Sequence, residues 1–156
     1  MSTNCRIGIE NKDGTITSIY CHHDGYMEGG VGERLVVHYT DEAKIKKLME
    51  LGDLSSLGTE PVENPNAWKT PSSQGLFTGT KSWIKIFREL HPEDKCDAYR
   101  TRGETCPAKI HKDMKDYGEA ARKQHSYYVY LFKDNKWYDL DSGNLVDVAA
   151  EIDKGE

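Results

Sequence analysis

The sequence lacks the long apolar runs and ligand motifs that would assign it to several large protein classes. No stretch approaches the ~20 apolar residues of a membrane helix, and residues 1–6 lack the apolar run of a signal peptide. We therefore expect no membrane association and a location in the cytoplasm. The absence of C-x-x-C, H-E-x-x-H and P-loop motifs gives no indication of a zinc site, a metalloprotease or a P-loop hydrolase. We expect no metal and no cofactor.

Cysteine is scarce, and neither sign of charge is in large excess. The four cysteines at positions 5, 21, 96 and 106 are expected to be reduced thiols, as is usual in a cytoplasm. There are 21 Lys and Arg against 26 Asp and Glu, a net charge of −5. This balance does not favour binding to nucleic acid, which needs clustered excess basic residues. The charge balance does not distinguish among other kinds of partner, such as a protein or a small molecule.

The length of 156 residues fits a single domain, since most domains have ~50 to ~250 residues. We expect one domain over residues 1–156. The hydrophobic fraction is only 37%, and three Trp, nine Tyr and three Phe partly offset it because aromatic side chains bury large areas. Prolines at 61, 65 and 71 predict a surface excursion over residues 59–80, and loops of that length are usually functional or mobile.

Alternating apolar residues and turn motifs predict a hairpin near each end of the chain. The first has strands at 5–11 and 15–22 around an Asp-Gly turn, and the second has strands at 126–132 and 136–140. Residues 53–58 are expected to form a turn, and 96–101 a short strand. Helices are expected at 33–39, 41–51, 81–90, 107–124 and 144–153. The predicted fold is α+β: an antiparallel sheet built from the N-terminal and C-terminal hairpins, with helices packed mainly on one face.

The first candidate site is the end of the second strand, where Cys21, His22, His23 and Asp24 follow one another. A thiol, two imidazoles and a carboxylate are zinc ligands, or parts of a nucleophile–base pair. The alternative is structural, with Cys21 buried and Asp24 in a turn. Because side chains alternate along a strand, Cys21 and His23 face one side and His22 the other, together with Tyr20. The four groups therefore cannot meet at one ion in strand geometry.

The second candidate site is the segment that contains Arg100, Arg102 and Glu104. In an extended segment the two arginines share a face and present paired guanidinium groups, which suit phosphate or carboxylate. A helix expected to begin at Pro107 would add an anion-binding N-terminus. The alternative is a solvated basic edge in which the arginines pair with Glu104 and Glu93.

The late aromatic run 126–132 has two faces. Tyr128, Tyr130 and Phe132 lie on one face, and Tyr127, Val129 and Leu131 on the other. Such aromatics stack bases in some RNA-binding proteins, but we expect them to be core.

Four motifs together resemble a known group of proteins. They are Ile-Tyr-Cys-His-x-Asp-Gly-Tyr at 19–26, Gly-Asp-Leu-Ser-Ser-Leu-Gly at 52–58, Arg-x-Arg-Gly-Glu at 100–104, and Tyr-x-Tyr-Leu-Phe…Trp-Tyr at 128–138. The set is similar to that of short, largely uncharacterised accessory proteins of bacteriophages and prophages. The similarity covers most of the chain apart from about 59–95 and the last helix. His23 stands where the pattern has an aromatic residue, which weakens its case as a ligand.

The resemblance implies a small accessory protein in the cytoplasm of an infected bacterium, where it binds and inhibits a host defence or regulatory factor. In one version it sequesters a phosphorylated signalling nucleotide, using Arg100, Arg102 and the glycine loop, with Tyr26 stacked on the base. In the other it inhibits a host protein directly, through the 59–80 excursion and Trp68. The alternative is a small phosphate-handling enzyme that uses Cys21 or His22 with Asp24.

The sequestration and enzyme hypotheses both require that segments 20–26 and 99–105 meet in one site. The sequence leaves open whether the chain forms a homo-oligomer.

Overall fold

Hairpins from the two ends of the chain lie side by side in one sheet. The computed structural model describes residues 3–69 and 80–154, without the side chains of 80–84. In chain order the elements are β1 (Cys5–Glu10), β2 (Ile16–Cys21), α1 (Val31–His38), α2 (Glu42–Glu50), β3 (Leu54–Ser56), α3 (Thr80–Leu90), β4 (Asp97–Ala98), the 3₁₀ helix η1 (Tyr99–Arg102), β5 (Lys109–His111), α4 (Met114–Lys123), β6 (Tyr128–Lys133), β7 (Lys136–Asp141), β8 (Asn144–Asp147) and α5 (Val148–Lys154).

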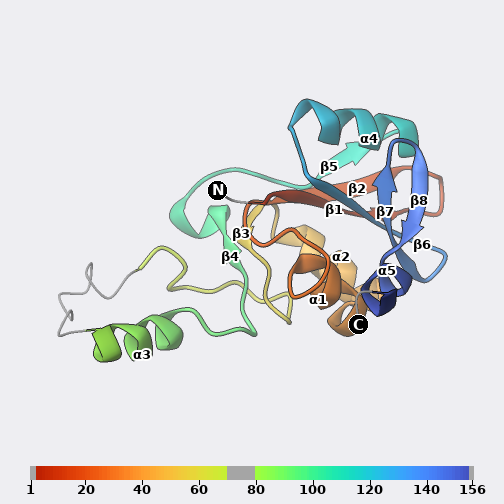
Figure 1. Cartoon of the computed structure of the whole chain (residues 1–156). Helices are drawn as coiled ribbons and strands as arrows, with labels where there is room; N and C mark the ends of the chain where they lie inside the picture. The colour runs from red at the N-terminus through yellow and green to blue at the C-terminus, as the bar shows by residue number, and fades with distance from the viewer. Residues whose placement is uncertain (1–2, 70–79, 155–156) are drawn as a thin grey trace.

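The strand order is β4-β3-β2-β1-β6-β7-β8, and β5 also pairs with β2 (Figure 1). The predicted α+β class and both antiparallel hairpins are confirmed. The two hairpins join through a parallel β1–β6 pair, and β2–β3 is parallel as well. The parallel junction arises because β1 and β6 each open a hairpin whose second strand lies on the outer side.

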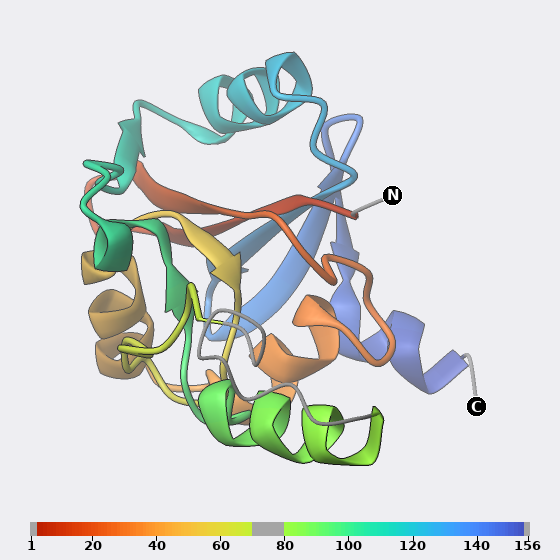
Figure 2. The same ribbon diagram turned by 90° about the vertical axis from the view of Figure 1, so that its left-hand side faces the viewer.

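Helices cover both faces of the sheet, with the larger group on one face. Figure 2 shows α4 on one side of the sheet and α1, α2 and α5 on the other. Alternation along β1 sends Cys5, Ile7 and Ile9 into the core under α1 and α2. Gly8 faces α4, where a Cβ atom would lie only 2.9 Å from the Tyr117 ring. A side chain at this position would therefore push α4 off the sheet.

The late aromatic run is core on both faces, as expected. Tyr130 and Phe132 belong to the cluster under α1, α2 and α5, whereas Val129 and Leu131 pack under α4. Tyr127, which precedes β6, is exposed. The stacking surface for RNA that this hairpin would need is therefore covered by helices.

Three short strands were not predicted from the sequence. The segment expected to be a turn contains β3, because the backbone N–H groups of His22 and His23 donate to Leu54 and Ser55. The helix predicted from Pro107 is wrong in its first turns: the chain there forms β5, and α4 begins only at Met114. The last predicted helix likewise begins with β8 and becomes α5 at Val148. β3 and β5 pair with the distant strand β2, and β8 pairs with the preceding strand β7. In each case strand pairing overrides the local sequence pattern.

Aspartate side chains cap the N-termini of α2 and α4. Asp41 caps α2 by accepting from the Ala43 N–H. Asp113 caps α4 by accepting from the Asp116 N–H at 2.8 Å. Both carboxylates satisfy backbone donors that have no partner within the helix.

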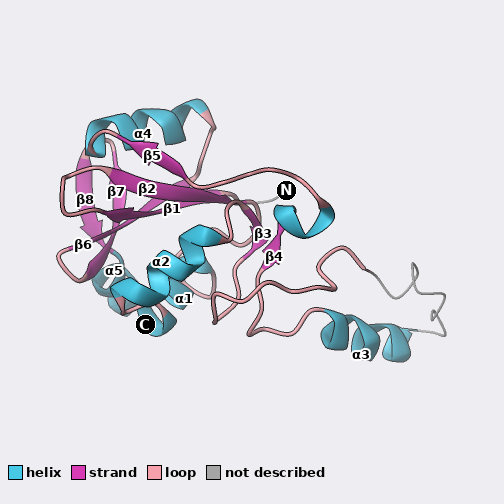
Figure 3. Ribbon diagram, turned by 180° about the vertical axis from the view of Figure 1, so that it is seen from behind, coloured by secondary structure: helices cyan, strands magenta, loops and turns pink. Residues whose placement is uncertain are grey.

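Figures 1 and 3 show α3 at one side of the molecule, away from the sheet. The predicted helix over 81–90 is confirmed, but the side chains of Trp83 and Ile84 lie outside the described residues. The same holds for residues 70–79 of the predicted surface excursion. Over 3–69 and 80–154, no helix is long and apolar enough to cross a membrane.

An arginine is buried between the sheet and α4. Arg6 is 1% exposed and donates to the Ser18 hydroxyl at 2.8 and 3.1 Å and to the Gln124 side-chain oxygen at 2.6 Å. The Ser18 hydroxyl lies 2.7 Å from His111 Nε2. Since this hydroxyl accepts from Arg6, its own proton is available to His111, which fits a neutral imidazole with an unprotonated Nε2. Burial, and then the charge of Arg6, lower the pKa of His111.

This network predicts a loss of stability in mild acid. Because the pKa of His111 is lower in the folded chain, its contribution to stability is present above ~6.5, the unfolded value, and is lost as pH falls through the folded value. We expect the wild type to lose more unfolding free energy between pH 7 and pH 5 than His111→Gln does, by about 1.4 kcal/mol for each unit of pKa difference.

The measurement is urea unfolding at pH 7, 6 and 5. His38→Gln, at an exposed histidine of α1, is the matched control and should follow the wild type. If His111→Gln loses as much stability as the wild type over this range, the proposed role of His111 is wrong.

Candidate functional site

The two segments predicted to meet lie on either side of β3. Cys21 pairs with Leu54, and Leu54 pairs with Ala98. Asp53 joins the two segments directly, because its carboxylate accepts from the Tyr20 N–H at 2.9 Å and its carbonyl accepts from the Tyr99 N–H at 3.2 Å. Burial raises the pKa of Asp53. The structure thus brings together the first residues of each segment, Tyr20 and Tyr99.

The residues from Cys21 to Asp24 point in different directions. The Cys21 side chain is fully buried in the core under α1 and α2, and its thiol donates to the His23 carbonyl. His22 lies with Tyr20, as alternation predicts, and its Nδ1 is 2.7 Å from the Tyr20 hydroxyl. Asp24 is exposed, adopts a positive φ and accepts from the Tyr26 hydroxyl at 3.3 Å.

These positions do not assemble a nucleophile, a base and an orienting acid. In the described part of the chain, no group of three or more His, Cys, Asp and Glu side chains is placed to hold a metal ion. All four cysteines are free thiols.

The two predicted arginines do not form a pair. The segment expected to be extended is the 3₁₀ helix η1, so Arg100 and Arg102 do not share a strand face. Arg100 binds the Glu63 carboxylate at 3.1 Å and the Glu50 carbonyl at 3.0 Å. Arg102 pairs with Glu104, two residues further along the chain. The expected helix N-terminus beside them is also absent, because no helix begins at Pro107.

Arg102 instead contacts two aromatic rings, one from the segment before α3 and one from η1 itself. Its guanidinium carbon lies 4.1 Å from the ring centroid of Trp68 and 5.4 Å from that of Tyr99. The two rings are 5.4 Å apart, centroid to centroid. Burial raises the pKa of Tyr99, and the negative charge on an ionised Tyr20 hydroxyl would raise it further. We call Tyr20, His22, Trp68, Tyr99 and Arg102 the aromatic–arginine surface.

The first part of the predicted excursion is held firmly against β4. The buried Asn64 side chain donates to the Leu90 carbonyl at 2.8 Å and to the Asp97 carboxylate at 3.0 Å. Its backbone N–H donates to the Cys96 carbonyl at 2.8 Å. Four residues later, the Trp68 indole N–H donates to the Ala98 carbonyl at 3.1 Å. These bonds fix the orientation of the Trp68 ring and so position the support on which Arg102 stacks.

The chemistry of this surface is that of recognition. A guanidinium over an indole ring is a cation–π contact, worth about 0.5–1 kcal/mol at an exposed site. The Arg102 side chain remains 48% exposed, so it can contact a partner while it stacks. Trp, Tyr and Arg are the residues enriched where binding energy is concentrated in protein interfaces.

The sequence predicted one site that contains His22, Arg102 and Glu104, and it assigned Trp68 to a separate surface. Tyr20 and Tyr99 were not selected. The contact of Trp68 with this site could not be predicted, because residues 54–56 were expected to form a turn and instead form β3, which lies between β2 and β4. The signal that was present is the segment 52–58 itself, which occurs as a motif together with segments 19–26 and 100–104. These three motifs are the ones that the β2, β3 and β4 strands place side by side.

Comparison with protein-family models, with curated proteins and with solved structures finds no match to this chain. The function is therefore inferred from the geometry of the site and from the sequence motifs.

The anchoring of Trp68 predicts that Asn64 is important for stability. Asn64→Ala leaves the Asp97 carboxylate and the Leu90 carbonyl without the amide donor that they share. We expect a loss of about 1–3 kcal/mol of unfolding free energy, the usual range for an unsatisfied buried group.

Asn66→Ala is the matched control, because only backbone groups of Asn66 take part in hydrogen bonds in the described structure. Urea unfolding at neutral pH measures both variants. Equal stability of the two variants would show that Asn64 does not anchor the segment.

Proposed function

We propose that this protein is a non-enzymatic inhibitor that binds a host protein through the aromatic–arginine surface. In this proposal the host is a bacterium infected by a phage, and the partner is a protein of defence or regulation. The setting follows from the resemblance of the four sequence motifs to those of phage accessory proteins. The mode of action follows from the chemistry of the surface.

One observation carries the proposal: the exposed Arg102 guanidinium lies over the Trp68 ring, beside Tyr99. An arginine held in this way loses little conformational freedom on binding, because its position is already fixed by the ring. Rigid aromatic side chains likewise present contact area at small entropic cost. A preorganised group of Trp, Tyr and Arg therefore supports docking against a protein.

Sequestration of a nucleotide is less well supported at this surface. A phosphate that binds Arg100 and Arg102 would have to displace Glu63 from one and Glu104 from the other. It would then lie beside two carboxylates, which repel it. An enzyme based on Cys21 is not supported either, because the thiol lies in the core away from His22.

The proposal is tested by reversing one charge. Tagged wild-type protein and Arg102→Glu are expressed in bacterial cells, and the co-purifying proteins are quantified by mass spectrometry. We expect one host protein to be recovered at near-stoichiometric amounts with the wild type and at least tenfold less with Arg102→Glu. The purified pair should show the same loss of affinity by calorimetry.

Lys47→Glu is the control, since Lys47 is an exposed basic residue of α2 that takes no part in the surface. It should recover the partner as the wild type does. Equal recovery by Arg102→Glu would contradict the proposal. So would a nucleotide that stabilises the wild type against heat but not Arg102→Ala, which would favour sequestration of a small molecule.

A further inference from the structure

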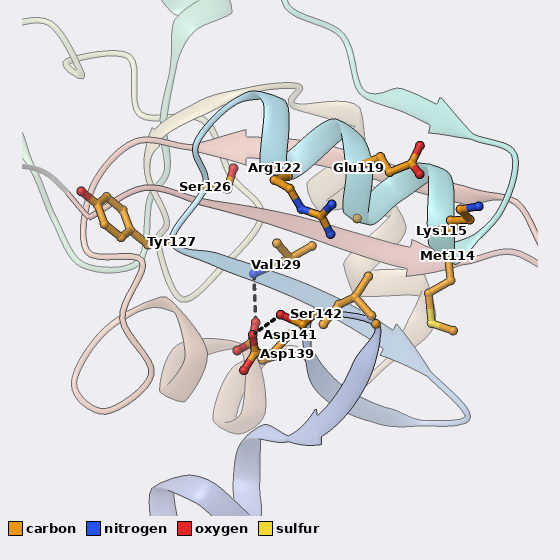
Figure 4. Close-up of a pocket in the computed structure, with 13 residues that line it drawn as sticks. Met114, Lys115, Glu119, Arg122, Ser126, Tyr127, Val129, Asp139, Asp141 and Ser142 are labelled. Atoms are coloured by element: carbon orange, nitrogen blue, oxygen red, sulfur yellow. Dashed lines mark hydrogen bonds between the residues drawn. The ribbon is translucent and has the colours of Figure 1, made fainter.

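A cleft on the α4 side of the molecule is separate from the aromatic–arginine surface. It lies between α4, the start of β6 and the turn from β7 to β8, and its volume is about 480 Å³ (Figure 4). Sites for small molecules typically measure about 300–1,000 Å³. The turn that forms one rim has a positive φ at both Ser142 and Gly143, as two-residue hairpin turns of this kind require. The backbone conformation of this rim is therefore fixed by a tight turn.

The walls of the cleft carry charges of both signs. On the α4 wall Arg122 extends toward the strand that bears Val129, and Lys115 and Glu119 lie on the same helix, whereas Asp139 and Asp141 come from β7 on the other side (Figure 4). In the described parts of the chain, the Arg122 side chain makes no ion pair or hydrogen bond. The guanidinium is thus available to an anionic group that enters the cleft.

The acidic wall is held in place by the sheet. One carboxylate oxygen of Asp139 accepts from the Val129 N–H at 3.0 Å. Burial raises the pKa of Asp139, and the charge of Asp141 raises it further. A cation placed between these two carboxylates would stabilise their ionised forms and so lower the pKa of Asp139.

The floor between the charged walls is apolar. Met114, Val129 and Leu140 line it, and Gly118 of α4 faces Leu140 without a side chain. A Cβ atom at position 118 would lie 3.2 Å from Leu140 Cδ2. The Ser126 hydroxyl oxygen is buried and has no hydrogen-bond partner in the described structure, and its residue lines the same cleft. The cleft therefore combines an apolar floor with polar groups at its sides.

The geometry points to a binding site for a free amino acid with an apolar side chain. Its carboxylate would pair with Arg122, its ammonium would lie between Asp139 and Asp141, and its side chain would cover Met114, Val129 and Leu140. A zwitterion carries one charge of each sign and so can pair with groups on both walls. A phosphate would bring two negative charges to a cleft lined by the carboxylates of Glu119, Asp139 and Asp141 and by only two cations, Lys115 and Arg122.

The test is binding of L-phenylalanine, L-leucine and L-methionine to the purified protein. Titrations are followed by NMR of the backbone amides and by calorimetry. We expect saturable binding of at least one of them, with the largest shifts at residues 114–129 and 139–143. For the best of the three, the N-acetyl derivative and the carboxamide should each bind at least tenfold more weakly, because each removes one of the two charges.

Variants then assign the two ends of the ligand. Arg122→Ala and Asp141→Asn should each raise the Kd at least tenfold. The controls Lys123→Ala, the next residue of α4, and Asp94→Asn should leave it unchanged, since both residues are exposed and outside the cleft.

The inference is overturned if none of the three amino acids binds the wild type. It is also overturned if the N-acetyl derivative binds as well as the free amino acid, or if Arg122→Ala binds normally. Arg102→Glu should bind the amino acid as the wild type does, so this result is independent of the partner that the aromatic–arginine surface recognises.

Discussion

The parallel pairing of β1 with β6 is the contact on which the rest of the structure depends. It aligns Cys5 with Tyr128 and continues to Ile9 and Phe132, joining the first hairpin to the last across the centre of the sheet. A parallel pair needs a long crossover, because the chain must return to the starting edge before the second strand can begin. Here the crossover carries α1, α2, α3 and α4, so the same connection supplies the helices for both faces (Figure 2). A shift of one residue in this register would turn Ile7 toward α4 and Arg6 into the apolar core.

Backbone groups that this arrangement leaves without strand partners are satisfied by carboxylates. Asp53 accepts from the Tyr20 N–H beside β5, and Asp139 accepts from the Val129 N–H where β6 begins. Both carboxylates are partly buried and have raised pKa values. Each marks a region with a proposed function: Asp53 joins the strands that carry the aromatic–arginine surface, and Asp139 forms one wall of the cleft. In both places the sheet is interrupted, which leaves side chains of neighbouring strands accessible.

Local patterns predicted the parts of the fold that local interactions determine. The two hairpins and most helices have strong periodicity and turn residues, and the alternation that separates Cys21 from His22 holds in the structure. The short strands β3 and β5 were missed because their conformation depends on β2, a partner distant in sequence. β8 pairs with the preceding strand β7 across a two-residue turn, and it was missed because residues 144–153 carry an apolar pattern typical of a helix. For the same reason the sequence identified Arg102 and Trp68 separately but could not show that one stacks on the other.

The central claim is that a host protein binds at the aromatic–arginine surface, and site-specific photocrosslinking tests it most directly. Benzoylphenylalanine is introduced at position 105, an exposed threonine three residues from Arg102, so that the surface itself stays intact. Separately, it is introduced at position 37 on α1, where the native valine is 60% exposed. Both proteins are irradiated in living bacterial cells. We predict one covalent adduct with a host protein from position 105 and none with that protein from position 37. The absence of an adduct at position 105, or the same adduct from both positions, would contradict the proposal.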